Sequence, residues 1–413
     1  MKHRFLIIIS FLLVLALPQG RACTVAVISG KYTTNGRPML WKNRDTWALN
    51  NQVVQFKGEK YNFVGLINSS DVNLKSIWIG MNDAGFAIMN SASYNLNHTS
   101  EHKLTGLEGQ LMKEALEKCG SLKQFEKLLD SKKKPTGLEA NFGVIDAYGG
   151  AAFYEFGHEG YTKVDVNDPL VAPFGYVIRG NYSNTGEIGV GSGYIRYNTV
   201  HQMFFQEATT IGLSPEFIET KVAKGLNHSL LKEDLKLTHG DLPENTPKYA
   251  HFRDYIPRSG SSSSVTIEGV KEGESPELIT FYGDIGFPLC SVVVPVWIKS
   301  GIELPRIVSL SVDYKDSPIC HAAMQLKTEK VMNIKWGKTD KYYIDVNALY
   351  NIDKTGIRQL LEPIEKKVYL KTNELMKEAR AKGDLSSDKV KEFYNYLDSY
   401  YAIAYNELFK IEL

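Results

Sequence analysis

The sequence RACTVAVISGKYTTNGRPMLWKNRD occupies residues 21–45. It contains one cysteine, two short apolar runs with an Asn-Gly pair between them, and a polar cluster at its end. The apolar runs at residues 24–28 and 38–41 have the composition of β-strands, and Asn-Gly is typical of a hairpin turn. Such a hairpin returns the polar residues 42–45 to the neighbourhood of Cys23, where we expect the chemistry to occur.

Residues 1–22 have the three parts of a secretory signal: a basic start, an apolar run at residues 5–17, and small residues before a cleavage site after Ala22. The apolar run is shorter than the roughly 20 residues that a membrane-spanning helix needs. We therefore expect a protein that is exported to the periplasm or the extracellular space, without an integral membrane span. Its mature chain would begin at Cys23.

A lipoprotein signal is the alternative, because in such proteins the cysteine after the cut carries lipid. Those signals normally have a larger aliphatic residue where Gly20 stands and a small uncharged residue where Arg21 stands. Under this alternative the chain would be a lipid-anchored binding or structural protein. A diacylglyceryl group on Cys23, detected by mass spectrometry, would favour it.

An N-terminal cysteine is unusual because one residue supplies both a nucleophile and a base. Cysteine thiols have a reference pKa of about 8.5 and α-amines one of about 7.7–8.0, so the amine can accept the thiol proton near neutral pH. A separate histidine is then unnecessary. The competing interpretation is that Cys23 is a small apolar residue that follows the signal by chance, and the polar residues 42–45 argue against it.

These residues resemble the start of the cysteine N-terminal-nucleophile (Ntn) hydrolases, which include choloylglycine hydrolases, penicillin V acylases, acyl-CoA:6-aminopenicillanate acyltransferases and acid-ceramidase relatives. Members begin Cys-Thr, continue as a strand and a turn, and reach an Arg-Asn-x-Asp motif. Here threonine follows Cys23, and residues 42–45 read KNRD. The resemblance implies that Cys23 is the nucleophile and that Asp45 orients it and its amine. Strict spacing places Lys42 at the position of the family arginine, with Arg44 as the alternative.

Three later positions extend the resemblance. Asn90 follows a glycine-led strand, where the family places part of its oxyanion hole, although an asparagine there also suits a turn. Asn181 matches the asparagine whose side chain donates to the oxyanion, and a donor of this kind contributes about 2.7–4 kcal/mol. It also begins a glycosylation sequence, and a glycan would block this role. Arg258 approximates a late arginine near the nucleophile, with Arg253 as a rival.

Two motifs typical of other chemistry are rejected. The H-x-x-E-H sequence at residues 98–102 lacks the apolar helical period that a zinc site of this kind needs. The glycine-rich residues 186–193 lack the Lys-Ser/Thr ending of a phosphate loop. We therefore expect neither a metal nor an organic cofactor. The cysteines show no zinc spacing, and with Cys23 free we expect no essential disulfide framework.

Composition and periodicity indicate the layout of the remaining chain. The chain has 48 basic and 47 acidic side chains, which argues against a nucleic-acid partner. Residues 141–147 and 151–155 predict a hairpin, and their sequence is also typical of the secreted bacterial Ntn group. We predict an α+β fold, namely a four-layer αββα sandwich of two antiparallel sheets at residues 23–335. A C-terminal helical extension at residues 336–413 would follow and end in a helical hairpin.

The resemblance implies hydrolysis of a linear amide C–N bond in a small-molecule N-acyl amide, through an acyl-enzyme on Cys23. An acyltransferase and a dipeptidase on the same fold are the alternatives. Bile-salt conjugates, penicillin V, acyl homoserine lactones and lipid N-acyl amides stay open as substrates, and we favour N-acyl amides of a lipid or amino-acid kind. Association of identical chains also stays open.

Overall fold

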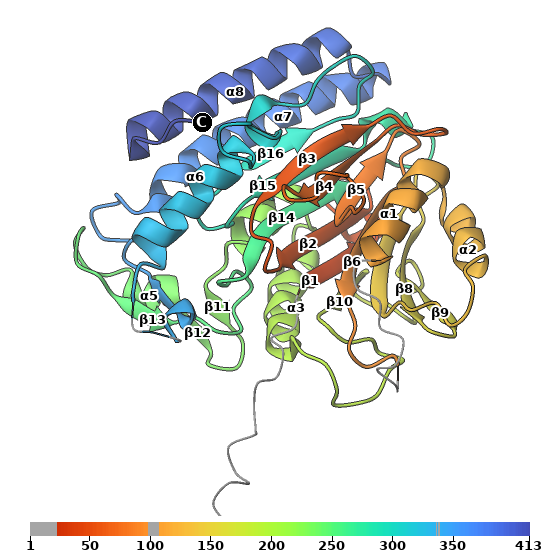
Figure 1. Cartoon of the computed structure of the whole chain (residues 1–413), viewed down its shortest axis with the longest axis horizontal. Helices are drawn as coiled ribbons and strands as arrows, with labels where there is room; N and C mark the ends of the chain where they lie inside the picture. Colours follow the sequence, from red (N-terminus) through yellow and green to blue (C-terminus); the bar gives the residue numbers. More distant parts are fainter. Residues whose placement is uncertain (1–22, 98–106, 336, 338) are drawn as a thin grey trace, which may run out of the picture.

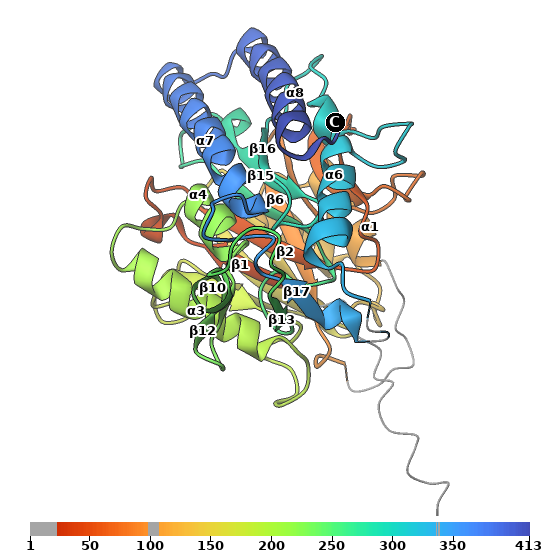
Figure 2. The same ribbon diagram turned by 90° about the vertical axis from the view of Figure 1, so that its left-hand side faces the viewer.

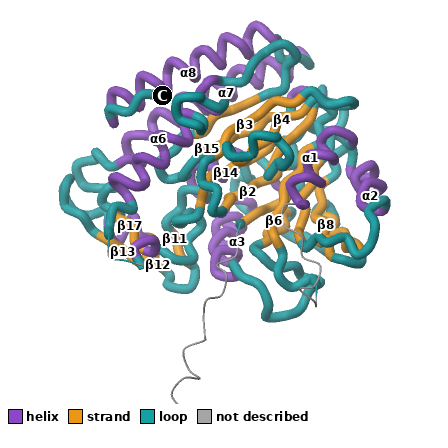
Figure 3. Tube along the Cα trace, in the orientation of Figure 1, coloured by secondary structure: helices purple, strands orange, loops and turns teal. Residues whose placement is uncertain are grey.

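The structure is a computed structural model, and it describes residues 23–97, 107–335, 337 and 339–413. Two large antiparallel sheets lie face to face, and helices cover the outer face of each sheet (Figure 1, Figure 3). This αββα arrangement confirms the predicted fold class. The rejected H-x-x-E-H sequence at residues 98–102 lies outside the described residues.

The six-stranded sheet contains the N-terminal hairpin. Its strands, in spatial order, are β10 (Tyr176–Arg179), β1 (Thr24–Ile28), β2 (Met39–Asp45), β14 (Ser261–Glu268), β15 (Thr280–Ile285) and β16 (Val293–Val296). Thr24 lies opposite Asn43 and Ile28 opposite Met39, so the predicted hairpin is present. Pro295 lies in β16, an edge strand of this sheet, where a missing N–H is tolerated.

The seven-stranded sheet is a meander in which sequential strands are neighbours. Its strands are β3 (Asn51–Phe56), β4 (Phe63–Asn68), β5 (Ile79–Asn82), β6 (Ala87–Ala92), β7 (Ala140–Ile145), β8 (Ala151–Gly157) and β9 (Gly160–Asp165). Two small ribbons pair β11 (Asn227–His228) with β12 (Glu233–Asp234) and β13 (Tyr249–His251) with β17 (Tyr343–Asp345). In the large sandwich, β1 and β2 pack against β6 and β7.

Helices cover both outer faces. On the seven-stranded sheet lie α1 (Leu107–Lys118) and α2 (Leu122–Asp130); on the six-stranded sheet lie α3 (Tyr194–Ala208) and α4 (Pro215–Phe217), continued by a π-helical turn at Ile218–Val222. Two more helices are α5 (Leu235–His239) and α6 (Pro318–Leu326). Separate apolar clusters fill the space between the sheets and the space beneath each helical layer.

The alternation of side chains along β1 explains how one strand serves two cores. Val25 and Val27 belong to the cluster between the sheets, whereas Ala26 and Ile28 belong to the cluster beneath α3. All four side chains are fully buried, as the unbroken apolar run predicts for a strand covered on both faces. Cys23, which immediately precedes this strand, also belongs to the cluster between the sheets.

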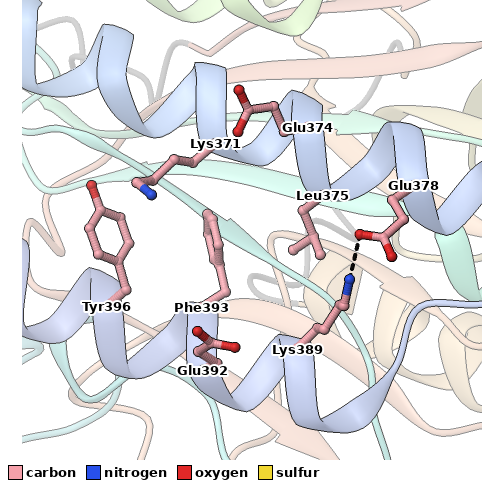
Figure 4. A pocket seen from close by; sticks show the side chains of 8 residues that line it. All are labelled: Lys371, Glu374, Leu375, Glu378, Lys389, Glu392, Phe393 and Tyr396. Atoms are coloured by element: carbon pink, nitrogen blue, oxygen red, sulfur yellow. Dashed lines mark hydrogen bonds and ion pairs between the residues drawn. The ribbon is translucent and has the colours of Figure 1, made fainter.

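The C-terminal helices α7 (Ile357–Lys382) and α8 (Ser387–Phe409) pack beside β16, and Figure 2 shows them above β15 and β16. Tyrosine hydroxyls of α8 bond the backbone near β16: Tyr401 donates to the Val293 carbonyl at 2.5 Å, and Tyr405 donates to the Cys290 carbonyl at 2.9 Å. A groove of about 330 Å³ lies between the two helices, with the Lys389–Glu378 ion pair at one end (Figure 4). The aromatic stripe of α8 is thus largely a packing surface.

Two further observations concern membrane-spanning helices and the cysteines. None of the described helices is long and apolar enough to cross a bilayer. All four cysteines lie in the described part of the chain, and each is buried and unpaired.

Candidate active site

Cys23 immediately precedes β1 and is 7% exposed. Because Val25 lies opposite Arg179 of β10, extending that register by two residues brings Cys23 opposite Asn181. On its other side, Thr24 lies opposite Asn43 of β2, so the neighbouring position brings Cys23 beside Arg44. The cysteine therefore stands between two segments that the sequence predicts for the site.

Asp45 ends β2 and makes several polar contacts. Its Oδ2 accepts a hydrogen bond from Arg258 Nε at 2.8 Å, and its Oδ1 accepts from Ser261 Oγ at 2.5 Å and from Asn43 Nδ2 at 3.1 Å. The nearest guanidinium nitrogen of Arg196 is 4.0 Å away. These contacts fix the carboxylate in one orientation, since it has hydrogen bonds on both oxygens.

The structure distinguishes the two late arginines. Arg258 pairs with Asp45 and its side chain is 21% exposed. Arg253 instead pairs with its neighbour Asp254 at 3.7 Å, and its side chain is 64% exposed. Arg258 is therefore the arginine that lies at the candidate site.

Lys42 points from β2 into the space between the sheets. Its Nζ donates to Asn90 Oδ1 at 2.6 Å and to the Trp78 carbonyl at 2.8 Å. Burial lowers the pKa of the Lys42 ammonium to about 8, although the nearby Cys23 acts in the opposite direction. Lys42 thus lies close to both the candidate nucleophile and a candidate oxyanion donor, with a proton that it can lose in mildly alkaline solution.

Arg44 points the same way but contacts different groups. Its Nη2 donates to Asn68 Oδ1 at 2.7 Å, its Nη1 bonds Asn51, and its guanidinium lies 4.8 Å from the centre of the Trp78 ring. Both cations of the KNRD sequence are therefore buried near Cys23, and Lys42 is the one that contacts Asn90.

Asn181 follows β10 and is fully buried. Its backbone N–H donates to the Ser192 carbonyl at 2.9 Å, and its Nδ2 donates to the carbonyl of Ala92 at 3.0 Å. Ala92 lies two residues after Asn90 in β6, so the two candidate oxyanion asparagines approach the same end of that strand. A side chain without exposed surface has no room for a glycan, so the glycosylation sequence is not a modification site in this fold.

Arg196 is a site residue that the sequence analysis missed. Its Nη1 donates to the Cys23 carbonyl at 2.9 Å and also bonds Thr24 Oγ1, while its Nη2 donates to Asn181 Oδ1 at 3.4 Å. It is 1% exposed, and burial, followed by the charge of Arg258, lowers the pKa of its guanidinium to about 10. Within the described part of the chain its Nε has no hydrogen-bond partner.

A sequence signal for Arg196 does exist. Arg196, Val200 and Phe204 are spaced four residues apart, and they form a buried stripe of α3. An arginine on an otherwise apolar stripe needs a polar partner in the interior.

The candidate site contains no cluster of metal ligands. In residues 23–97, 107–335, 337 and 339–413, no group of three or more His, Cys, Asp or Glu side chains could hold a metal ion. The side chains assembled around Cys23 are instead amides, cations and one carboxylate, a set that suits acyl transfer to a thiol.

Comparison with known proteins gives partial likenesses only. No protein-family model matches the sequence, and no curated protein matches it. An N-acylethanolamine-hydrolyzing acid amidase (NAAA) ortholog from Caenorhabditis elegans aligns over 45% of this chain and 79% of its own, with 13% identity and a TM-score of 0.35. A mutant of the conjugated bile acid hydrolase from Clostridium perfringens aligns over 67% and 92%, with 10% identity and a TM-score of 0.38.

Penicillin V acylase from Agrobacterium tumefaciens is similar to the same degree. It aligns over 67% of this chain and 87% of its own, with 13% identity and a TM-score of 0.37. All three alignments have TM-scores below 0.4.

Proposed function

We propose that the mature protein is an exported cysteine Ntn hydrolase that begins at Cys23 and cleaves the linear amide C–N bond of an N-acyl amide. The observation that carries this proposal is the strand register, in which Asn181 lies opposite Cys23 and Asp45 follows the residue opposite Cys23 on its other side. Asn90 bonds Lys42, which lies in the same strand as Asp45. These are the groups that thiol-based acyl transfer requires: a nucleophile, a means of holding its amine, and donors for the oxyanion.

In the proposed reaction, Cys23 Sγ attacks the carbonyl carbon of the substrate while the thiol proton passes to the Cys23 α-amine. The carbonyl oxygen becomes an oxyanion, which Nδ2 of Asn181 and of Asn90 stabilise. The C–N bond then breaks, and the leaving amine takes the proton from the α-ammonium. A water molecule gives a proton to the α-amine, attacks the thioester, and releases the acid and the thiol.

The surrounding residues have distinct proposed roles. Asp45, fixed by Arg258 and Ser261, orients the α-amine and stabilises its protonated form. Lys42 and Arg196 each donate to the Oδ1 atom of one asparagine, so each asparagine presents its amide nitrogen as a donor.

The charge of the site supports one class of N-acyl amide. Lys42, Arg44, Arg196 and Arg258 bring four cationic side chains near Cys23, and Asp45 is the carboxylate that contacts two of them. We propose that the substrate carries a negative charge, as an N-acyl amino acid does, because a carboxylate would be attracted to these cationic side chains. An acyltransferase would use the same acyl-enzyme, and added amine acceptors would reveal it by diverting product from the free acid.

The test compares Cys23→Ala with Cys119→Ala on a panel of N-acyl amino acids, neutral lipid N-acyl amides, bile-salt conjugates and penicillin V. Cys119 is a buried cysteine in the cluster beneath α1, so it controls for the loss of a buried thiol. We expect Cys23→Ala to abolish turnover and Cys119→Ala to retain it, with the anionic amides turned over fastest. Full activity of folded Cys23→Ala on the best substrate would refute the proposal.

A further inference from the structure

We infer that Glu155 is a positioning residue for Asn181, because its buried carboxylate holds the chain on both sides of that asparagine. This inference rests on the proposed function, in which Asn181 is an oxyanion donor. Glu155 lies in β8 of the seven-stranded sheet, whereas Asn181 follows β10 of the six-stranded sheet. The contact therefore joins the two sheets at the candidate site.

The hydrogen bonds of Glu155 bracket Asn181 along the chain. Its Oε1 accepts from Arg179 Nε at 2.8 Å, two residues before Asn181, and from the backbone N–H of Asn184 at 2.9 Å. Its Oε2 accepts from the backbone N–H and the hydroxyl of Thr185 at 2.9 and 2.6 Å. With both flanks fixed on one carboxylate, the turn that carries Asn181 has little freedom to shift relative to β8.

The carboxylate has the charge that this arrangement needs. The side chains of Glu155 and Arg179 are 0% and 3% exposed. Burial alone would raise the pKa of Glu155, but Arg179, the Thr185 hydroxyl and two backbone N–H groups outweigh it and lower the pKa below the usual value. An ionised carboxylate can accept all four hydrogen bonds, whereas a neutral amide in its place would turn its NH₂ group toward at least one donor.

Two neighbouring amides, Asn95 in the loop after β6 and Asn141 in β7, hold the same turn but carry no charge. Asn95 Oδ1 accepts from the backbone N–H of Ser183 at 2.7 Å, and Asn141 Oδ1 accepts from Ser183 Oγ at 2.6 Å. Asn141 also lies directly opposite Glu155 in the β7–β8 ladder and donates to the Tyr182 carbonyl at 3.1 Å. The turn is therefore seated on a continuous polar surface, in which Glu155 provides the strongest acceptor.

The experiment is a double-mutant cycle between Glu155→Gln and Asn181→Ala, with kcat and KM measured on the best N-acyl amide. A displacement of a catalytic donor by about 1 Å can cost on the order of 100-fold in rate. We expect Glu155→Gln to lower kcat by about 10-fold to 100-fold with KM changed by less than about 3-fold. In the Asn181→Ala background the same change should have almost no further effect, because the donor that it positions is gone.

Glu268→Gln is the matched control. Glu268 is a buried carboxylate that bonds Arg380 of α7 and Asn35, and both of these residues lie away from the turn at residues 181–185. It should lower stability without coupling to Asn181→Ala. Should Glu155→Gln fail to fold, Thr185→Val removes one of the four hydrogen bonds at an exposed position and should show a smaller loss of kcat with the same coupling.

Two results would overturn the inference: an unchanged kcat in folded Glu155→Gln, or losses that multiply fully in the double variant. Either result leaves the proposed function intact if Cys23→Ala is inactive. Activity of Cys23→Ala would instead refute the proposed function itself, so the two failures are distinguishable.

Discussion

Lys42 Nζ lies 2.6 Å from Asn90 Oδ1, and this hydrogen bond joins β2 of one sheet to β6 of the other inside the candidate site. An amide whose oxygen accepts from an ammonium presents its nitrogen in a defined direction. Lys42 therefore both contributes charge near Cys23 and orients Asn90, the second candidate oxyanion donor. Because a lysine can lose its proton, the contact is also sensitive to pH.

This contact predicts an alkaline limb in the rate profile. Lys42 is charged below its pKa of about 8 and neutral above it, so the rate of acylation should fall as pH rises through about 8. Lys42→Arg keeps the charge at higher pH and should move this limb upward, whereas Lys42→Met should be slow at every pH. The measurement is kcat/KM against pH for the three proteins. Identical profiles for the wild type and Lys42→Arg would exclude Lys42 as the titrating group.

Arg196 gives a second prediction, because its three polar contacts depend on a planar guanidinium. Arg196→Lys keeps the charge, but one ammonium cannot reach Cys23, Thr24 and Asn181 together. We expect kcat to fall by about 10-fold to 100-fold, in line with the loss of one well-placed donor or its support. Arg253→Lys, at an exposed arginine outside these contacts, should keep the wild-type kcat.

A fully active Arg196→Lys would show that these contacts only stabilise the fold. Thermal unfolding of the same variants separates the two effects, because a packing defect lowers the midpoint without lowering kcat of the folded protein.

Local patterns predicted much of this architecture. The N-terminal hairpin, the strands around it and the long C-terminal helices follow from turn residues and apolar periodicity, which act between close neighbours in the chain. Boundaries were less accurate: for the hairpin predicted at residues 141–147 and 151–155, the strands are β7 at Ala140–Ile145 and β8 at Ala151–Gly157. The first strand ends earlier because Asp146 forms the turn, with its Oδ1 accepting from the backbone N–H groups of Tyr148 and Gly150.

The proximity of candidate site residues was predictable only where they belong to one short motif. Cys23, Lys42 and Asp45 come together through a single hairpin, so their spacing predicts their proximity. Arg196 reaches the Cys23 carbonyl across 173 positions, and Glu155 holds the chain around Asn181 from the other sheet. Contacts of this kind depend on how layers stack, which no local pattern reports.

The C-terminal helices provide a prediction about stability. Glu365 of α7 is fully buried and bonds both Lys224 and Arg358, and Lys224 also pairs with Asp284 at 2.9 Å. Glu365→Gln leaves the two cations short of one carboxylate, so it should cost about 3–5 kcal/mol of unfolding free energy. Denaturant titration measures this loss, and kcat of the folded fraction should not change.

Glu378→Gln is the control on the same helix. Glu378 pairs with Lys382 and Lys389 at the exposed side of α7, where solvent screens the charges. The unfolding midpoint of Glu378→Gln should match that of the wild type. Equal losses of unfolding free energy in the two variants would show that the buried network stabilises the packing of α7 no more than the exposed ion pairs do.

The most direct test of the account concerns the amine of Cys23. If this amine is the base, a peptide bond to its nitrogen removes the base, because an amide cannot accept the proton. Three preparations should therefore be compared on the best N-acyl amide: protein purified from the exported fraction, a cytoplasmic version that retains residues 20–22, and the same version trimmed to Cys23. Intact mass and N-terminal sequencing define each chain end. We predict that the exported and trimmed proteins begin at Cys23 and are active, and that the extended protein folds but is inactive. Turnover by verified uncut protein at the rate of the trimmed form would contradict the N-terminal-nucleophile mechanism, even if Cys23 proved essential.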